Sequence, residues 1–346
     1  MSTTPTTTDQ RRGWRIVDPV FQLRALETGE IYELPDPRAV WKSTLGTGAS
    51  SQMRLRDPSG RASRRHGYIE WDGERWTMHD FESKNGIWVD GIRRRSAELA
   101  PGLAVGVGGL TLLAESADLL QLRAVVAWLI GYAAAQEHEV DRALRGLRDA
   151  ALLRASLVLC GEGDLVPLIQ RLHRETLGAD RPFIACEPTD RALELLSQAG
   201  DGTLCVSAAD PPEDFADAVH QLLTTPAATR LVLWASDARD ASPLGAALGP
   251  TVWIELPALA TRKDELPRIL REAAAAAATD FGQPFAPLRE GDLERLTIEP
   301  FDGLADVHDA ARRVVAFRTF GVTAGAAKLG INHGALSRWI RRRKLT

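Results

Sequence analysis

The chain has 346 residues, of which 45% are apolar and 25% charged, a composition typical of a folded protein with two or three domains. This composition excludes a collagen and a disordered chain. A small disulfide-stabilised protein is also excluded, because three cysteines cannot cross-link a chain of this length. The longest apolar run, residues 124–135, is shorter than the roughly 20 residues that a membrane-spanning helix needs. The polar N-terminus lacks the apolar core of a signal peptide, so we expect a cytoplasmic protein that does not enter a membrane.

Charge is distributed unevenly along the chain. The net charge is −4, but residues 321–346 contain six basic and no acidic side chains, which leaves a net charge of −10 on the remainder. The six are Lys328, Arg338, Arg341, Arg342, Arg343 and Lys344. This concentration of positive charge predicts an anionic partner for the C-terminal end.

The N-terminal third of the chain has a β pattern. Residues 1–13 are polar and rich in threonine, and we expect them to be disordered. Residues 14–116 contain short alternating apolar and polar runs separated by Gly, Pro, Asp and Ser, which predicts an all-β sandwich. Five of the nine tryptophans lie in this region, as the small core of a sandwich requires.

Two motifs in this region point to a family. The first is Ser63-Arg64-Arg65-His66, and the second is Asp80-Phe81-Glu82-Ser83-Lys84-Asn85-Gly86-Ile87-Trp88-Val89-Asp90-Gly91. Their spacing and their flanking strands resemble the forkhead-associated (FHA) domain over about 90 residues. The resemblance implies a β-sandwich that binds phosphothreonine peptides.

The resemblance also implies roles for individual residues. The phosphopeptide site would consist of Ser63, Arg64, Ser83, Lys84 and Asn85. Ser63 would bond the phosphate with help from Arg64, and Asn85 would hold the peptide backbone, with Ser83 and Lys84 beside it. For His66 we expect a packed side chain that braces the loops.

One position departs from the family pattern. The family has a Gly-Arg pair whose arginine grips the phosphate, whereas Gly46 is followed here by Thr47. Loss of a charge-assisted hydrogen bond worth roughly 1.5 to 3 kcal/mol weakens binding about tenfold to a hundredfold. Replacement cations are available between residues 53 and 66, namely Arg54, Arg56, Arg61, Arg64 and Arg65. Two interpretations remain open: these arginines bind phosphate, or they form a solvated basic face on a module for unphosphorylated partners.

The apolar spacing becomes helical from Ala117, which predicts a helical linker over residues 117–153. Short apolar strands then alternate with helical segments, which predicts a parallel α/β domain over residues 154–271. The expected strands are 156–160, 183–186, 203–206, 231–235 and 252–256, and two expected helices are 165–176 and 215–223. A helical lid is expected over residues 272–316.

Four phrases of this region, in order, resemble the AAA+ domain of NtrC-type activators of the sigma-54 system. They are Leu159-Cys160-Gly161-Glu162-Gly163, Arg181-Pro182-Phe183-Ile184-Ala185-Cys186, Asp201-Gly202-Thr203-Leu204-Cys205-Val206, and Leu256-Pro257-Ala258-Leu259 with Arg262-Lys263-Asp264-Glu265-Leu266-Pro267. The resemblance implies an α/β core with a helical lid.

The residues that ATP hydrolysis needs are missing from these phrases. Gly163 runs into Asp164-Leu165-Val166 without the Gly-Lys of a phosphate loop, and Ser207 and Ala208 replace the acidic pair that holds Mg²⁺ and water. The loop that engages the sigma factor has no room between Cys186 and Gly202, and the lid phrase at residues 302–306 lacks its arginine. We therefore expect a pseudo-ATPase core, not an enzyme and without a cofactor. The cysteines lack zinc spacing, so we expect no metal site.

The C-terminal segment has the spacing of a helix-turn-helix. Ala326 is small where two helices must touch, Gly330 falls at the turn, and Asn332 is placed to cap the second helix. Residues 317–346 resemble the Fis-type helix-turn-helix that ends NtrC-type activators. The resemblance implies a DNA-binding set of Asn332, His333, Gly334, Ser337, Arg338, Arg341, Arg342, Arg343 and Lys344. The major groove would be faced by His333, Gly334, Ser337 and Arg338, and the phosphates by Arg341, Arg342, Arg343 and Lys344.

These observations lead to a multidomain fold and to three hypotheses. The first is a bacterial DNA-binding regulator, dimeric, that binds double-stranded DNA and senses a protein partner, phosphorylated on threonine, through its FHA-like domain. The second is an interaction scaffold that uses the FHA-like surface and binds nucleic acid only weakly. The third, an active sigma-54 activator, needs catalytic residues that the sequence lacks.

Overall fold

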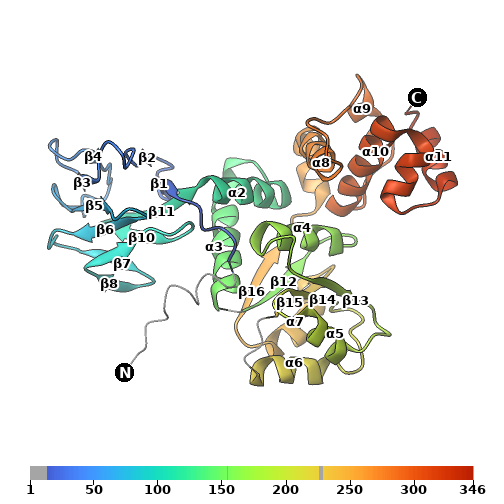
Figure 1. The fold of residues 1–346 in the computed structure, drawn as a ribbon, viewed down its shortest axis with the longest axis horizontal. Coiled ribbons are helices and arrows are strands. Elements are labelled where there is room, and N and C mark those ends of the chain that lie inside the picture. The colour runs from blue at the N-terminus through green and yellow to red at the C-terminus, as the bar shows by residue number, and fades with distance from the viewer. Residues whose placement is uncertain (1–13, 154, 226–228, 346) are drawn as a thin grey trace. The chain divides into compact units, whose positions relative to one another are not determined.

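The computed structural model describes residues 14–153, 155–225 and 229–345, so the expectation for residues 1–13 lies outside the described residues. The chain forms two compact units, which meet in sequence between Ala124 and Val125 (Figure 1). Each unit has its own core and is described separately.

The first unit is a sandwich of two sheets. Its strands are β1 (Val20–Ala25), β2 (Ile31–Glu33), β3 (Lys42–Gly46), β4 (Met53–Arg54), β5 (Gly67–Trp71), β6 (Trp76–Asp80), β7 (Ile87–Val89), β8 (Ile92–Arg94), β9 (Ser96–Glu98), β10 (Ala104–Val107) and β11 (Leu110–Ser116). One sheet has the order β2-β1-β11-β10-β7-β8 and the other β4-β3-β5-β6-β9. Alternate side chains of facing strands, such as Leu23, Ile69 and Met78, are fully buried between them. The expected all-β sandwich is confirmed.

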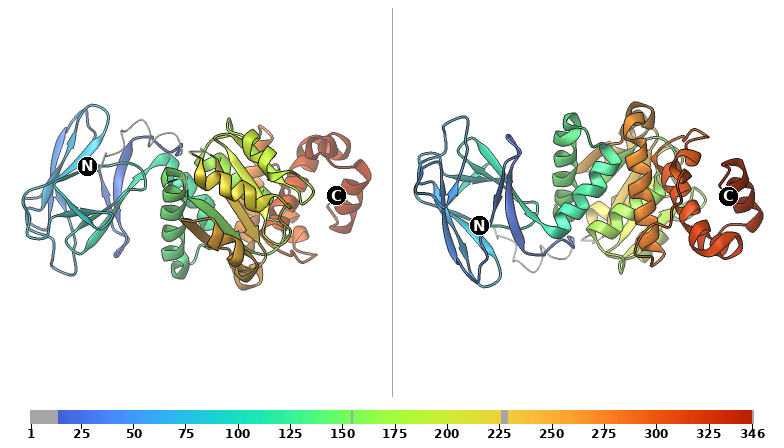
Figure 2. Two further views of the ribbon diagram at one scale, coloured as in Figure 1. Left: turned by 90° about the horizontal axis from the view of Figure 1, so that it is seen from below. Right: turned by 90° about the horizontal axis from the view of Figure 1, so that it is seen from above.

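The second unit contains a parallel sheet of β12 (Ser156–Cys160), β13 (Phe183–Cys186), β14 (Thr203–Ser207), β15 (Arg230–Ala235) and β16 (Thr251–Glu255). Its order is β13-β14-β15-β12-β16. Helices α5 (Ala192–Ala199), α6 (Phe215–Thr224) and α7 (Ala238–Ala247) share one core with the sheet, and α4 (Val166–Thr176) lies on the opposite face (Figures 1 and 2). The expected parallel sheet is present, and each strand end lies within one residue of its expected position.

The segment expected to be a linker forms helices, and its residues 125–153 belong to the second unit. The helices are α2 (Ala117–Ile130), η1 (Ala134–Gln136) and α3 (Glu137–Leu153). The Trp128 indole is fully buried and donates to the backbone oxygen of Ile269 at 3.0 Å. The buried Arg262 guanidinium donates to the backbone oxygens of Leu129 at 2.7 Å and Trp128 at 3.0 Å, and so caps the C-terminus of α2. Residues 125–153 are therefore packed into the second unit and do not form a free connection.

Within the described residues, no single helix is long and apolar enough to cross a membrane. One pair of helical segments, α2 and the η1–α3 stretch, has sufficient length and apolar composition when taken together, but the pair is bent by 109°.

The remaining helices end the chain. They are η2 (Leu259–Glu265), α8 (Leu266–Asp280), α9 (Asp292–Leu296), α10 (Leu304–Leu329) and α11 (His333–Arg342). Gly321 interrupts α10 with a φ of 76°, so residues 304–320 and 322–329 are two helical segments. The boundary expected between lid and helix-turn-helix, at 316–317, falls inside the first of them, and the boundary at 271–272 falls inside α8.

A buried ion pair joins α9 to α10. The Arg318 guanidinium donates to the two carboxylate oxygens of Asp292 at 2.6 and 2.9 Å, and both side chains are almost completely buried. Burial by itself would raise the pKa of Asp292. The hydrogen bond from Arg318, the hydrogen bond from the Arg289 N–H and the positive charge of Arg318 outweigh burial, so the pKa is lowered. The pair holds α9, which has five residues and little apolar surface of its own, on the last long helix of the chain.

Replacing Asp292 by alanine should destabilise the second unit by about 3–5 kcal/mol, because the carboxylate that neutralises a buried guanidinium is lost. The double variant Asp292→Ala/Arg318→Met should recover a large part of that loss, since neither charge is then buried. Denaturant unfolding followed by circular dichroism measures both free energies. Equal stabilities of the wild type and Asp292→Ala would show that the pair contributes nothing.

Candidate functional site

Three loops of the first unit meet at one end of the sandwich: residues 47–52, 55–66 and 81–86. The Thr47 N–H donates to the backbone oxygen of Ser63 at 3.1 Å, and the Gly48 N–H donates to that of Arg64 at 2.9 Å. Glycine is required at residue 46, because a Cβ there would lie 2.3 Å from the Arg64 oxygen. The close approach of backbone to backbone explains the Gly-Thr-Gly sequence and fixes the first two loops together.

Asp57 organises the second loop. Its carboxylate accepts hydrogen bonds from the N–H groups of Ser59 at 2.9 Å, Ala62 at 2.6 Å and Gly109 at 3.2 Å, and from Ser59 Oγ at 2.6 Å. Burial opposes ionisation, but these hydrogen bonds outweigh it and hold the pKa of Asp57 below its usual value. Asp57 was not predicted from the sequence, although an Asp followed two residues later by Ser is a turn signal.

His66 joins the second loop to the third. The imidazole is completely buried. Its Nδ1 accepts from the Ser63 N–H at 3.0 Å, so the proton is on Nε2, which lies 3.0 Å from the Gly86 oxygen and 2.9 Å from Ser83 Oγ. The prediction that His66 braces the loops is confirmed.

The structure brings Ser63, Lys84 and Asn85 together. The Lys84 N–H donates to Ser63 Oγ at 3.4 Å, and Asn85 Nδ2 donates to the Arg61 oxygen at 2.6 Å. Each of these contacts joins the second loop to the third, and the Lys84 side chain is exposed. The predicted residues of the two motifs therefore form one surface.

Ser83 is a correction to the predicted set. Its side chain is 6% exposed, and its Oγ accepts from the Gly86 N–H at 2.9 Å and contacts the His66 ring. A hydroxyl with these partners serves the loop and is not presented to a ligand. Motif position alone does not distinguish it from its exposed neighbour Lys84.

Two arginines stand where a replacement cation for the Thr47 position is needed. The side chains of Arg61 and Arg64 are exposed, and neither has an acidic partner among the residues described. Their backbones lie in the loop contacts given above. By contrast, Arg56 pairs with Glu30 at 3.2 Å, and Arg65 lies over the Phe81 ring at 5.1 Å. Arg54 is also exposed and has no acidic partner among the described residues, so Arg54, Arg61 and Arg64 remain available of the five arginines between residues 53 and 66.

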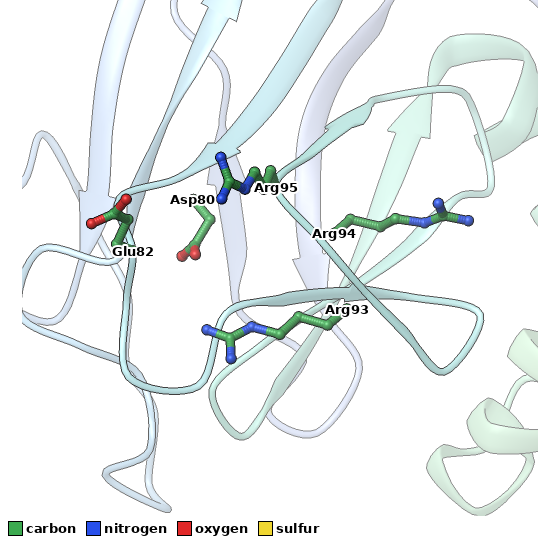
Figure 3. Close-up of a pocket in the computed structure, with 5 residues that line it drawn as sticks. All are labelled: Asp80, Glu82, Arg93, Arg94 and Arg95. Carbon is green, nitrogen blue, oxygen red and sulfur yellow. The ribbon is translucent and has the colours of Figure 1, made fainter.

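A further basic group adjoins the same surface. A cavity of about 440 Å³ is lined by Asp80, Glu82, Arg93, Arg94 and Arg95 (Figure 3). This run of three arginines was not among the predicted site residues, although it closely follows the second motif in the sequence.

In the second unit, the loop after β12 occupies the position of the expected phosphate loop. It carries Glu162 and Asp164, and Glu162 accepts from the Leu259 N–H at 3.1 Å. A Cβ on Gly303 would lie 2.6 Å from the Glu162 backbone oxygen, so residue 303 packs directly on this loop. Burial raises the pKa of the neighbouring Cys160 to about 11, with contributions from the carboxylates of Glu255, Asp237 and Asp240. The surroundings of the loop are acidic.

Two helices joined by a short turn end the described part of the chain. Gly330 ends α10 in the left-handed conformation, with a φ of 69°, and Asn332 Oδ1 caps α11 by accepting from the Gly334 N–H at 2.8 Å. Ala326, Leu336 and Trp339 are buried. Asn332, His333, Arg338, Arg341, Arg342 and Lys344 are exposed, whereas Gly334 and Ser337 are half-buried.

Arg343 is a second correction. It is 4% exposed, and its guanidinium donates to the Leu296 oxygen and lies 5.0 Å from the Phe301 ring and 5.4 Å from the Trp339 ring. The side chain is therefore internal and is not free to bind a phosphate. Arg342 is exposed but forms an ion pair with Glu299 at 2.8 Å.

Comparison with known proteins agrees with the loop geometry. The family model for the FHA domain matches residues 43–108. A solved FHA domain, from an analysis of phosphothreonine-dependent FHA interactions, is 28% identical, and the match covers 28% of this chain and 94% of that one with a TM-score of 0.25. The FhaA FHA domain, solved with the intracellular domain of Rv3910, is 29% identical, with coverages of 27% and 96% and a TM-score of 0.24.

The FHA domain of the CT664 protein from Chlamydia trachomatis is 22% identical, with coverages of 28% and 97% and a TM-score of 0.25. No curated protein matches the chain. The family match includes both motifs and all three loops that carry the site. Residues 43–108 are therefore an FHA domain, a protein-interaction module of the class that binds phosphothreonine.

Proposed function

We propose that the FHA domain of this protein binds a partner through a phosphorylated threonine. The observation that carries the proposal is the meeting of Ser63, Lys84 and Asn85 on loops held by one buried histidine, beside cations that lack an acidic partner. A phosphate group brings a charge of about −1.5 to −2 and three acceptor oxygens. The exposed Arg61, Arg64 and Lys84 side chains supply the complementary charge.

The hydrogen bonds within the site leave the right groups for a peptide. Ser63 Oγ accepts from the Lys84 N–H, so its own proton is available to a phosphate oxygen. Asn85 donates to Arg61 through Nδ2, so its Oδ1 is available to a peptide N–H. Thr47 contributes its backbone to the loop contact, and its short neutral side chain cannot replace the charge of an arginine.

Ser63→Ala and Asn85→Ala should each weaken binding of a phosphothreonine peptide about tenfold, because each removes a hydrogen bond to a charged or buried group. Thr47→Arg should strengthen it by a similar factor by adding a charge-assisted bond. Fluorescence anisotropy with a phosphothreonine peptide library measures these affinities, and Ser96→Ala, an exposed serine on β9, is the control. Equal affinity for phosphorylated and unphosphorylated peptides would exclude phosphothreonine recognition.

We further propose that the second unit is a pseudo-ATPase core of the AAA+ type. Strands β12 and β15 are neighbours, but the chain leaves them toward opposite edges of the sheet, and ligands of open α/β sheets bind at such a point. Glu162, Asp164 and Asp237 stand near it, and the backbone of Gly303 fills space against the loop. These carboxylates would repel the phosphates of a nucleotide.

ATP with Mg²⁺ should neither be hydrolysed nor shift the thermal unfolding midpoint of the protein. A bound nucleotide would stabilise the folded state by mass action and raise that midpoint. A phosphate-release assay together with a thermal shift titration tests both statements. Turnover that survives repeated purification, or a concentration-dependent shift, would refute the pseudo-ATPase proposal.

A second function, favoured by the exposed basic surface of α11, is DNA binding. Arg338, Arg341 and Lys344 are exposed, and no acidic side chain among the described residues pairs with any of them. We infer that α11 enters the major groove, that Arg338 reads bases, and that Arg341 and Lys344 bind phosphates. It follows that the protein is a regulator, which binds DNA as a dimer and binds a phosphorylated partner through its FHA domain. The competing proposal, a scaffold, has the same FHA function without DNA binding.

Arg338→Ala should reduce the preference for sites selected from a random DNA library by roughly 1–3 kcal/mol. Arg341→Ala should weaken all duplexes alike and lower the salt slope by about one. Anisotropy titrations of the full chain at several salt concentrations separate the two effects, with Arg271→Ala, an exposed arginine on α8, as the control. If both variants weaken selected and random duplexes by one common factor, sequence-specific binding is excluded, and absence of binding favours the scaffold.

A further inference from the structure

The cavity beside the FHA loops is built by two segments. Asp80 and Glu82 come from the end of β6 and the loop after it, and Arg93, Arg94 and Arg95 come from β8 and the residue after it. Side chains alternate along a strand, and Figure 3 shows Arg93 and Arg95 turned toward the space near Asp80 while Arg94 points the other way. Both directions are open, because all three arginines are exposed.

The arginines of this cavity have unused binding capacity. Arg93 donates to the Ser83 oxygen at 3.2 Å, and no carboxylate in the described part of the chain forms an ion pair with Arg93, Arg94 or Arg95. Asp80 faces them but already accepts from the Ser83 N–H at 3.2 Å. The cavity lining has three positive and two negative side chains. A guanidinium group can bind a carboxylate or a phosphate in a bidentate geometry.

The cavity adjoins the loop that carries part of the candidate phosphothreonine site. The Arg93 side chain lies over Gly86, where a Cβ would approach its Nε to 2.3 Å, and it contacts Ser83. Residues 84 and 85, which belong to the site, lie between these two contacts in the chain. One short loop therefore contributes residues to the phosphothreonine site and contacts an arginine that lines the cavity.

We propose that Arg95, with Arg93, binds a second anionic side chain of the same partner peptide, a carboxylate or a phosphate. This subsite rests on the proposed phosphothreonine function, because the peptide must already lie along the loop of residues 83–86. Glu82 lines the same cavity, and its charge opposes the anion.

The test compares three kinds of peptide on the full chain: one with a phosphothreonine in a neutral background, one with a second anion placed in turn at each neighbouring position, and one with that anion but unmodified threonine. Aspartate and phosphoserine serve as the second anion and distinguish the two sources. We expect the wild type to bind the best doubly anionic peptide about three- to tenfold more tightly than the singly phosphorylated one, with the gain decreasing as salt is added.

Arg95→Ala should lose this gain and keep its affinity for the singly phosphorylated peptide, which also shows that the variant is folded. Glu82→Gln should increase the gain by removing a repulsive charge. Arg38→Ala, an exposed arginine of the same unit that does not line the cavity, should leave it unchanged. No gain at any position, or a gain that Arg95→Ala retains, would overturn the subsite.

The outcome also separates the subsite from the phosphothreonine site. If the singly phosphorylated peptide fails to bind, the proposed function of the FHA domain is wrong. The third peptide then decides: binding that requires Arg95 supports an anion site in the cavity, and absence of binding excludes such a site.

Discussion

The surface of the FHA domain depends on one buried side chain. His66 accepts a hydrogen bond from the Ser63 N–H on one side and contacts Gly86 and Ser83 on the other, so a single ring connects two loops. Ser63 belongs to the second loop, and Lys84 and Asn85 to the third. Hydrogen bonds from the Lys84 N–H to Ser63 Oγ and from Asn85 Nδ2 to the Arg61 oxygen join the same loops, and the buried imidazole adds three further contacts. The ring needs no contact with a ligand to control what the surface binds.

Local sequence signals predicted the parts of the structure that depend on neighbouring residues. The strands of the parallel sheet were located to within one residue because buried parallel strands are continuous apolar runs. The Asn332 cap and the left-handed Gly330 follow from chemistry within a few residues. His66 was also predicted, through its place in a family motif.

Contacts between distant residues were not predictable in this way. Arg343 stands in a run of basic residues, yet its partner Leu296 is 47 residues away, and only the packing of α9 makes the arginine internal. Ser83 and Lys84 are adjacent polar residues, and the tertiary position of His66 decides which of them is exposed. The helices at 125–153 resembled a linker because their partners, Ile269 and Arg262, lie over a hundred residues further on. The roles proposed in DNA and nucleotide recognition remain predictions.

The contacts of α9 have a practical consequence for dividing the protein. Asp292 binds Arg318 and Leu296 binds Arg343, so α9 contacts both α10 and the residue that follows α11. A C-terminal fragment that begins at residue 301 would keep the six basic side chains of residues 321–346 but lose these partners of Arg318 and Arg343. A fragment that keeps both contacts therefore begins before residue 292, well upstream of the basic segment that the sequence makes conspicuous.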